Sequence, residues 1–229
     1  MCGRMTQTRP VRDYALLFDA TPVPGLSFAP RYNLAPSQKA LAIRLDLPAG
    51  RRELWTPTWG LVPHWARERG TIAPINARIE TVGTRPMFRE SFRRRRCLVP
   101  ADGYFEWQAL SGGKTPWYFR RASGEPLALA GLWDSWRSPA TGEILETFAV
   151  LVRPASREVR FVHDRMPVLL GREEEKDWLD PSRIPGEAFL SRLSDREPKD
   201  LVAYEVGRGV NSPRNEGPAL ILPWGPGPP

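Results

Sequence analysis

The chain has 229 residues, of which 41% are hydrophobic and 26% charged, and its formal net charge is +7 at pH 7. It contains no run of about 18 apolar residues, which excludes an ordinary membrane-spanning helix, and its N-terminus lacks the basic and apolar regions of a secretory signal. We therefore expect a cytoplasmic protein with no membrane segment and a sizeable core.

The excess of 33 Lys and Arg over 26 Asp and Glu favours a polyanionic partner such as nucleic acid. Only four of these basic residues are lysines, and a GC-rich genome would produce the same preference for arginine. Charge alone therefore leaves nucleic-acid binding open, and the placement of the arginines has to decide it.

The first half of the chain predicts strands with two helices between them. A short helix is expected over 10–18 ("PVRDYALLF"), and a turn containing Asn33 and Pro36 leads into an alternating strand. The segment 53–66 ("ELWTPTWGLVPHWA") predicts a strand and an aromatic loop. A basic helix followed by a strand is expected over 86–108.

The second half predicts further strands and two more helices. The segment 115–133 ("TPWYFRRASGEPLALAGLW") predicts a hairpin with "SGEP" as its turn. The remaining expected elements are strands over 144–156, 159–170 and 201–206, and helices over 172–180 and 186–194.

Together these elements predict an α+β fold, a single domain of curved, mostly antiparallel, barrel-like sheets with scattered short helices. The 25 prolines are spread along the chain, and no repeat or linker divides it. We assign the domain to residues 1–222 and expect a flexible Pro/Gly tail over 223–229.

Several kinds of site find no support in the sequence. The two histidines and two cysteines do not have zinc-ligand spacing, and no phosphate-binding glycine loop or G-x-S-x-G motif is present. We expect no metal and no cofactor. Cys2 and Cys97 are expected to be free thiols, with Cys97 buried in an apolar strand.

Two segments place a small polar side chain beside an arginine. In extended backbone, residues i and i+2 share a face, so Asn76 and Arg78 point the same way, as do His163 and Arg165. Each residue alone also fits a structural role. Glu106 is harder to explain structurally, because it lies between Phe105 and Trp107, where burial would raise its pKa and suit it to proton transfer.

The chain begins "MCGR", so removal of Met1 would make Cys2 the first residue. An N-terminal cysteine carries an amine and a thiol on adjacent carbons. This pair can condense with an aldehyde, which an internal cysteine cannot do in the same way.

The motifs "MCGR", "RYNLAP", "WGLVPHW", "NARIET", "CLVPADGYFEW" and "VHDRMP" occur in this order. With them the chain resembles the SRAP family (SOS-response-associated peptidase) from Cys2 to about "NEGPALILP". The resemblance implies a DNA-damage protein that binds single-stranded DNA and crosslinks covalently to abasic sites through the N-terminal cysteine. It also implies removal of Met1, by autoproteolysis or an aminopeptidase, and peptidase- or lyase-like chemistry in a monomer.

The resemblance also assigns roles to individual residues. It implies an active site of Cys2, Asn76, Glu106 and His163. The implied DNA contacts are phosphate binding by Arg78 and Arg165, with Arg4 and Arg85 as further candidates, and base stacking by Trp65 or Trp107. The segment "PHWA" departs from family members with two adjacent tryptophans, since Ala66 follows Trp65.

Two other functions stay open at this stage. Glutamine amidotransferases with an N-terminal nucleophile also begin "MCG", and there Cys2 would attack an amide with its own amine as base. A DNA-binding module that makes no covalent bond is the second alternative. The paired arginines fit the amidotransferase less well than the two DNA-binding functions.

Overall fold

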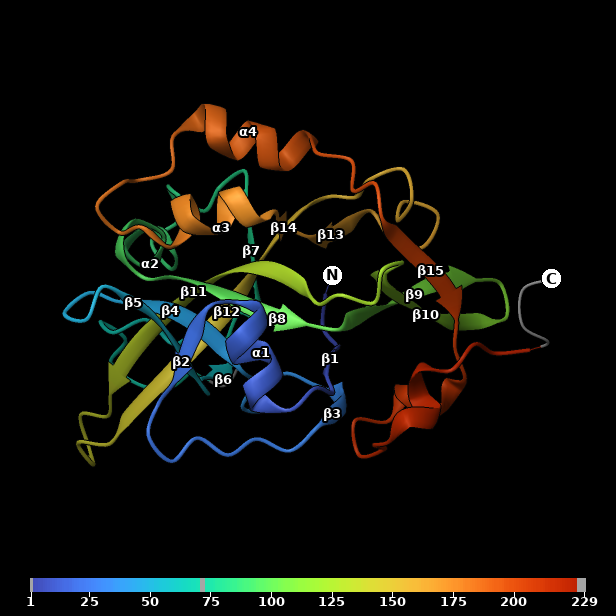
Figure 1. Cartoon of the computed structure of the whole chain (residues 1–229), viewed down its shortest axis with the longest axis horizontal. Helices are drawn as coiled ribbons and strands as arrows, with labels where there is room; N and C mark the ends of the chain where they lie inside the picture. Colours follow the sequence, from blue (N-terminus) through green and yellow to red (C-terminus); the bar gives the residue numbers. More distant parts are fainter. Residues whose placement is uncertain (1, 71–72, 226–229) are drawn as a thin grey trace.

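The structure is a computed structural model that describes residues 2–70 and 73–225. Two curled, mostly antiparallel sheets and four short helices form a half-barrel in one domain (Figure 1). The predicted α+β class is confirmed.

The smaller sheet has the strand order β15-β10-β9-β1-β3, and each neighbouring pair is antiparallel. Its strands are β1 (Met5–Gln7), β3 (Arg31–Leu34), β9 (Gly103–Leu110), β10 (Gly113–Arg121) and β15 (Leu201–Glu205).

The larger sheet has the order β13-β12-β11-β8-β4-β5-β2, while β14 pairs with β11, and β6 and β7 pair with β12. Its strands are β2 (Ala20–Pro22), β4 (Ala42–Asp46), β5 (Arg51–Trp55), β6 (Thr58–Trp59), β7 (Asn76–Arg78), β8 (Arg96–Ala101), β11 (Leu127–Arg137), β12 (Ile144–Pro154), β13 (Arg165–Pro167) and β14 (Leu169–Leu170).

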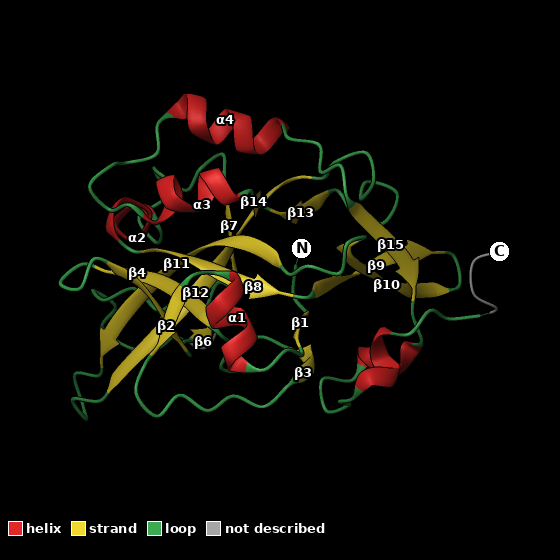
Figure 2. Cartoon of the chain, viewed as in Figure 1, coloured by secondary structure: helices red, strands yellow, loops and turns green. Residues whose placement is uncertain are grey.

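The helices lie on the larger sheet. They are α1 (Val11–Leu17), α2 (Arg89–Arg94), α3 (Arg172–Leu179) and α4 (Glu187–Asp195). Figure 2 shows α2, α3 and α4 grouped along one side of this sheet, with α1 in front of it. Two short 3-10 helices, η1 (Arg208–Asn211) and η2 (Pro218–Ile221), lie at the other end beside the smaller sheet.

Alternation along β8 separates two apolar clusters, one on each face of the larger sheet. Cys97 and Val99 point into a cluster that also holds Cys2 and Tyr104, whereas Leu98 points into a cluster with the apolar residues of all four helices. Both faces of this sheet are therefore covered, and its central strands are apolar throughout. The N-terminus of the chain belongs to the face that meets the smaller sheet.

The hairpin predicted over 115–133 is wrong, although both of its strands exist. β10 pairs with β9 and β15, whereas β11 pairs with β8, β12 and β14 in the other sheet. The turn does form, because Gly124 N–H donates to the Arg121 carbonyl, but Ala122 N–H donates to Asp200 in another part of the chain. The chain changes sheet here because other strands already occupy both edges of β10 and β11.

The strand predicted over 159–170 is only partly correct. Residues 165–167 and 169–170 form β13 and β14, but the residues before them turn back on themselves. The N–H groups of Val159 and His163 donate to the carbonyls of Ser156 and Val159. This turn brings His163 to the start of β13. The other predicted helices and the strands over 144–156 and 201–206 are present.

The fourth arginine of "RRRR" is a core residue. Arg96 is only 3% exposed, and it joins the end of α2 to the end of α3. Its guanidinium donates to the carbonyls of Phe92, Arg93, Trp178, Asp180 and Arg183. The basic run therefore does not present four charges to one partner.

Both cysteines are free and buried, as predicted for Cys97. The segment expected to be a flexible tail is described only to residue 225. In that part, Pro223 forms a β-bridge with Val206, and Trp224 N–H donates to the Glu205 carbonyl. Residues 226–229 and Met1 lie outside the described residues. No helix in the described ranges has the length and apolar character needed to cross a bilayer.

Candidate functional site

The structure places Asn76 directly against Cys2. Asn76 Nδ2 donates to the Cys2 backbone carbonyl over 3.1 Å. Parallel pairing of β7 with β12 sets this position, because Asn76 lies opposite Val150 in the register. Cys2 is fully buried in the apolar cluster between the sheets. Within the described residues, Asn76 Oδ1 is buried and has no hydrogen-bond partner, so this acceptor remains available.

Glu106 is a buried carboxylate beside Cys2. It is 2% exposed on β9, and burial raises its pKa, while the nearby His163 acts in the opposite direction. Burial also raises the pKa of the Cys2 thiol, and the charge of Glu106 raises it further. The site therefore favours a neutral thiol next to a carboxyl group that holds its proton to higher pH than an exposed glutamate does.

His163 lies just before β13, and its ring is held by the backbone N–H of Arg165. Its Nδ1 accepts the Arg165 backbone N–H over 3.0 Å. The exposed Asp164 carboxylate lies 2.9 Å from the same nitrogen, but only the Arg165 amide is fixed by a strand, so we assign Nδ1 as its acceptor. In the neutral ring the proton is then on Nε2.

Glu106 and His163 line the same pocket. It has a volume of about 410 Å³, and its lining residues are Arg4, Glu106, Trp107, Lys114, His163 and Asn211. These residues come from the segments near both ends of the chain, from β9 and β10, and from the turn before β13. The pocket joins a carboxyl group, an imidazole and an indole beside the N-terminus. The described residues contain no cluster of three His, Cys, Asp or Glu side chains suited to a metal ion.

The arginines predicted to bind phosphate border this region, and they differ in exposure and ion pairing. Arg78 is exposed at the end of β7 and has no ion pair among the described residues. Arg165 is 19% exposed and pairs with Glu80 at 2.5 Å. β7 and β13 both pair with β12 at Val152, on its two opposite edges, so β12 lies between the strands that carry these two arginines.

Arg4 and Trp107 lie in the pocket but are already bonded. Arg4 Nη1 donates to Asn33 Oδ1 over 2.6 Å and to the Val210 carbonyl over 2.7 Å, and its guanidinium lies 5.8 Å from the Trp107 ring. The Trp107 indole N–H donates to Asn211 Oδ1 over 2.7 Å. Arg4 therefore holds the C-terminal segment against the pocket.

The structure does not bring every predicted residue to the pocket. Arg85 is exposed in the turn after β7, and Trp65 is exposed in the loop before β7; neither lines the pocket. Any DNA contact of Arg85 or Trp65 would therefore lie outside this pocket.

Sequence reasoning missed three residues near the pocket. Tyr104 is fully buried two residues before Glu106 on β9, and its hydroxyl has no hydrogen-bond partner among the described residues. Its i, i+2 relation to Glu106 places both on one face of the strand, and this signal was present in the sequence. Lys114 and Asn211 reach the pocket only through the pairing of distant segments, which no local pattern indicates.

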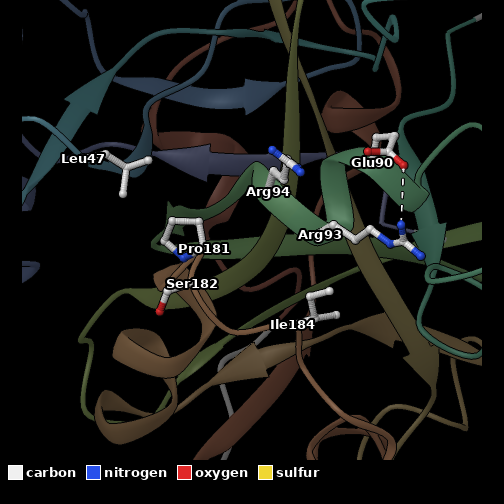
Figure 3. A pocket seen from close by; sticks show the side chains of 7 residues that line it. All are labelled: Leu47, Glu90, Arg93, Arg94, Pro181, Ser182 and Ile184. Atoms are coloured by element: carbon white, nitrogen blue, oxygen red, sulfur yellow. Dashed lines mark ion pairs between the residues drawn. The ribbon is translucent and has the colours of Figure 1, made fainter.

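A larger pocket lies at α2, away from all these residues (Figure 3). It has a volume of about 590 Å³, and Arg93 pairs there with Glu90 at 3.9 Å. The lining residues are Leu47, Glu90, Arg93, Arg94, Pro181, Ser182 and Ile184. It holds no cysteine, histidine or lysine, so the acid–base groups of the smaller pocket have no counterpart here.

Comparison with known proteins connects this geometry to a family. The family model "SOS response associated peptidase (SRAP)" matches residues 1–213. The chain is 37% identical over 224 residues to the abasic site processing protein YoqW of Bacillus subtilis, with 96% of this chain and 99% of that protein covered. It is 30% identical over 226 residues to the abasic site processing protein HMCES of Gallus gallus, covering 86% and 67%.

A solved structure has the same fold. A protein from Bacteroides thetaiotaomicron superposes with a TM-score of 0.86 at 25% identity, and the match covers 97% of this chain and all of that one.

Proposed function

Because the chain belongs to the SOS response associated peptidase (SRAP) family, we propose that it traps abasic sites in single-stranded DNA as a covalent adduct of Cys2. The names of its relatives as abasic site processing proteins support this substrate. The observation that carries the chemistry is the arrangement at Cys2: Asn76 bonded to its carbonyl and the buried Glu106 beside it. The protein would act on DNA in the cytoplasm, after removal of Met1.

The first step opens the sugar. An abasic sugar is mainly a closed hemiacetal, and opening transfers a proton from its C1 hydroxyl to the ring oxygen. His163 is suited to help. Its Nδ1 accepts the Arg165 amide, so in the neutral ring the proton that it can transfer is on Nε2. The product is an aldehyde.

The amine of Cys2 then attacks the aldehyde carbon and forms a carbinolamine. Loss of water gives an imine, and this loss needs a proton on the departing hydroxyl. Glu106, whose pKa is raised by burial, is suited to supply that proton. An α-amine has an ordinary pKa of about 7.7–8.0, so part of it is neutral and nucleophilic at the same pH.

The thiol closes the ring. Loss of water leaves the imine protonated on nitrogen. The sulfur adds to its carbon, the C=N π electrons become the lone pair of the ring nitrogen, and the thiol proton is released to the Glu106 carboxylate, which gives a neutral five-membered thiazolidine. The raised pKa of the thiol keeps it neutral until this step, so the amine reacts first. A well-oriented intramolecular group has an effective molarity of about 10⁵ M or more, which favours closure over loss of the reversible imine. Asn76 would orient the new ring through its free Oδ1.

The arginines would hold the strand on either side of the abasic sugar. Arg78 and Arg165 lie on the two strands that flank β12, and a guanidinium can bind phosphate through two parallel hydrogen bonds. Arg165 would have to exchange Glu80 for phosphate. Trp65 and Trp107 offer ring faces for stacking, while Arg85 is a further phosphate contact.

The test is a denaturing gel with a single-stranded oligonucleotide that carries one abasic site. The wild-type protein should give a shifted band that survives heat and detergent. Cys2→Ala, which retains the amine without the thiol, should bind the same oligonucleotide but give no stable band, and Cys2→Ser is the matched control that also keeps a side chain of nearly the same shape. A stable band from Cys2→Ala would refute the assignment. Glutaminase activity without any adduct would favour the amidotransferase alternative.

A further inference from the structure

The loop between β6 and β7 holds an exposed indole in a fixed frame. Trp65 is 53% exposed, yet the backbone on both sides of it is bonded to the core. His64 N–H donates to Asp134 Oδ2 over 3.1 Å. The Ala66 carbonyl accepts the indole N–H of Trp136 over 2.8 Å. The indole of Trp65 therefore projects from a short segment that is bonded to β11 on both sides.

Asp134 is the centre of this frame. Its side chain is 2% exposed and its carboxylate pairs with Arg95 Nε at 3.0 Å. The Ser135 N–H donates to it over 2.8 Å and the Ser91 hydroxyl over 3.3 Å. A buried carboxylate is costly unless it is paired and hydrogen bonded, so this network fixes Asp134 in one orientation.

The ring of His64 joins the same network. Its Nδ1 lies 3.0 Å from Asp134 Oδ2 and 2.9 Å from Arg95 Nη2. Both the backbone and the side chain of the residue before Trp65 are thus held by one carboxylate and its partner arginine. The backbone from which the indole projects is therefore fixed on both sides.

An exposed tryptophan on its own needs no explanation, since single apolar side chains are common on protein surfaces. Trp65 differs because a buried carboxylate, that of Asp134, fixes the backbone of the residue before it. The residues that follow it, Arg67 and Arg69, are exposed, and the same connection ends at Asn76 and Arg78. An aromatic platform next to exposed cations is the arrangement on which single-stranded bases stack, and fixing it in advance lowers the entropy cost of binding.

We propose that Asp134 is a positioning residue for nucleic-acid binding. It holds residues 64–66 so that the Trp65 indole stacks on a base of the strand that passes Arg78. Asp134 does not touch the strand and acts only through Trp65. This inference rests on the proposed function, because it requires a bound single strand.

The test is a double-mutant cycle on the affinity for an undamaged, fluorescently labelled single-stranded oligonucleotide, measured by anisotropy. Trp65→Ala should weaken binding about tenfold, within the range expected for the loss of one stacked base. Asp134→Asn keeps the shape but removes the charge, and it should weaken binding about threefold or more. In the Trp65→Ala background, Asp134→Asn should change the affinity less than twofold, because its only route of action is already gone.

Two further variants separate positioning from loss of structure. Asp102→Asn is the matched control: Asp102 accepts hydrogen bonds from Thr8, Arg9 and Tyr14, away from the loop. It should lower the melting temperature without changing affinity in either background. Trp136→Phe removes the N–H that holds the Ala66 carbonyl, together with part of the buried ring, and it should behave like Asp134→Asn if that variant does not fold.

Each outcome decides the inference. Non-additive effects of Asp134→Asn and Trp65→Ala support it. Equal weakening in both backgrounds, or none in the wild type, would overturn it while leaving the proposed function intact. Absence of any binding by the wild-type protein would overturn the proposed function and this inference with it.

Discussion

The Cys2 end and the α2 end of the molecule both collect arginines beside a pocket, and they lie near opposite ends of β12. Arg165 lies opposite Pro154 at the C-terminal end of that strand. Arg95, by contrast, pairs with Asp134, which is opposite Thr147 near the N-terminal end. The α2 end has the larger pocket and the denser run of charge (Figure 3).

The two ends differ in what their charges do. At α2, Arg96 donates to backbone carbonyls and Arg95 forms an ion pair with the buried Asp134 carboxylate. Half of the "RRRR" run therefore stabilises the fold. At the Cys2 end, Arg78 is free of ion pairs among the described residues, and Arg165 pairs only with Glu80, which is partly exposed. The comparison teaches that charge density in sequence does not locate a binding site. What matters is whether the donors are already satisfied.

The largest expected effect separates chemistry from stability at the Cys2 end. Glu106→Gln should slow adduct formation by about 10²- to 10⁴-fold, because the amide keeps the shape but cannot carry the proton. The affinity for single-stranded DNA should change little. Single-turnover rates from pH 5 to 8 provide the measurement, and rates equal to wild type across that range would remove Glu106 from the mechanism.

The same substitution should stabilise the fold at neutral pH. Burial raises the pKa of Glu106, so the folded state holds this proton more tightly than the unfolded state does. Stability therefore falls as pH rises through the interval from the ordinary glutamate pKa to the raised one. Urea unfolding should show Glu106→Gln to be more stable than wild type at pH 7.5, with a smaller difference at pH 4.5. An equal difference at both pH values would contradict the raised pKa.

The α2 end should show the opposite behaviour. Arg96→Met removes a buried donor from five carbonyls, of which those of Phe92 and Trp178 are buried, and should cost about 3 to 5 kcal/mol of unfolding free energy. Arg94→Met, exposed at the end of α2, is the matched control and should stay within about 0.5 kcal/mol. Folded Arg96→Met at low temperature should still form the adduct. An adduct rate that falls with unchanged folding would place Arg96 in the reaction.

The smallest effect concerns salt. Arg78→Ala and Arg165→Ala should each weaken binding of single-stranded DNA and reduce the slope of log affinity against log salt by about 0.7 for each lost phosphate contact. Arg94→Ala should leave the slope unchanged. If the slope stayed as steep as in wild type in both Arg78→Ala and Arg165→Ala, or if it fell in Arg94→Ala, the assignment of phosphate contacts to the Cys2 end would be contradicted.

Local patterns in the sequence predicted the fold class, most elements and the candidate residues, because apolar periodicity and the motifs are local. They failed where partners are distant. The hairpin over 115–133 was wrong because strand pairing depends on which edges other strands occupy. The sequence also gave no sign that Arg96 is buried, because its acceptors are backbone carbonyls from three segments. The i, i+2 relation of Tyr104 to Glu106, by contrast, is visible in the sequence.

The central claim, that the amine of Cys2 is the nucleophile, is tested most directly by blocking that amine. One lysine inserted between Met1 and Cys2 should keep the initiator methionine in place and leave Cys2 with an amide nitrogen, which cannot form an imine. The same lysine added after Pro229 is the matched control. The N-terminal variant should give no heat-stable adduct with an abasic single strand, while the control should match wild type, with mass spectrometry showing that its adduct begins at Cys2. A heat-stable adduct from the N-terminal variant would contradict the account.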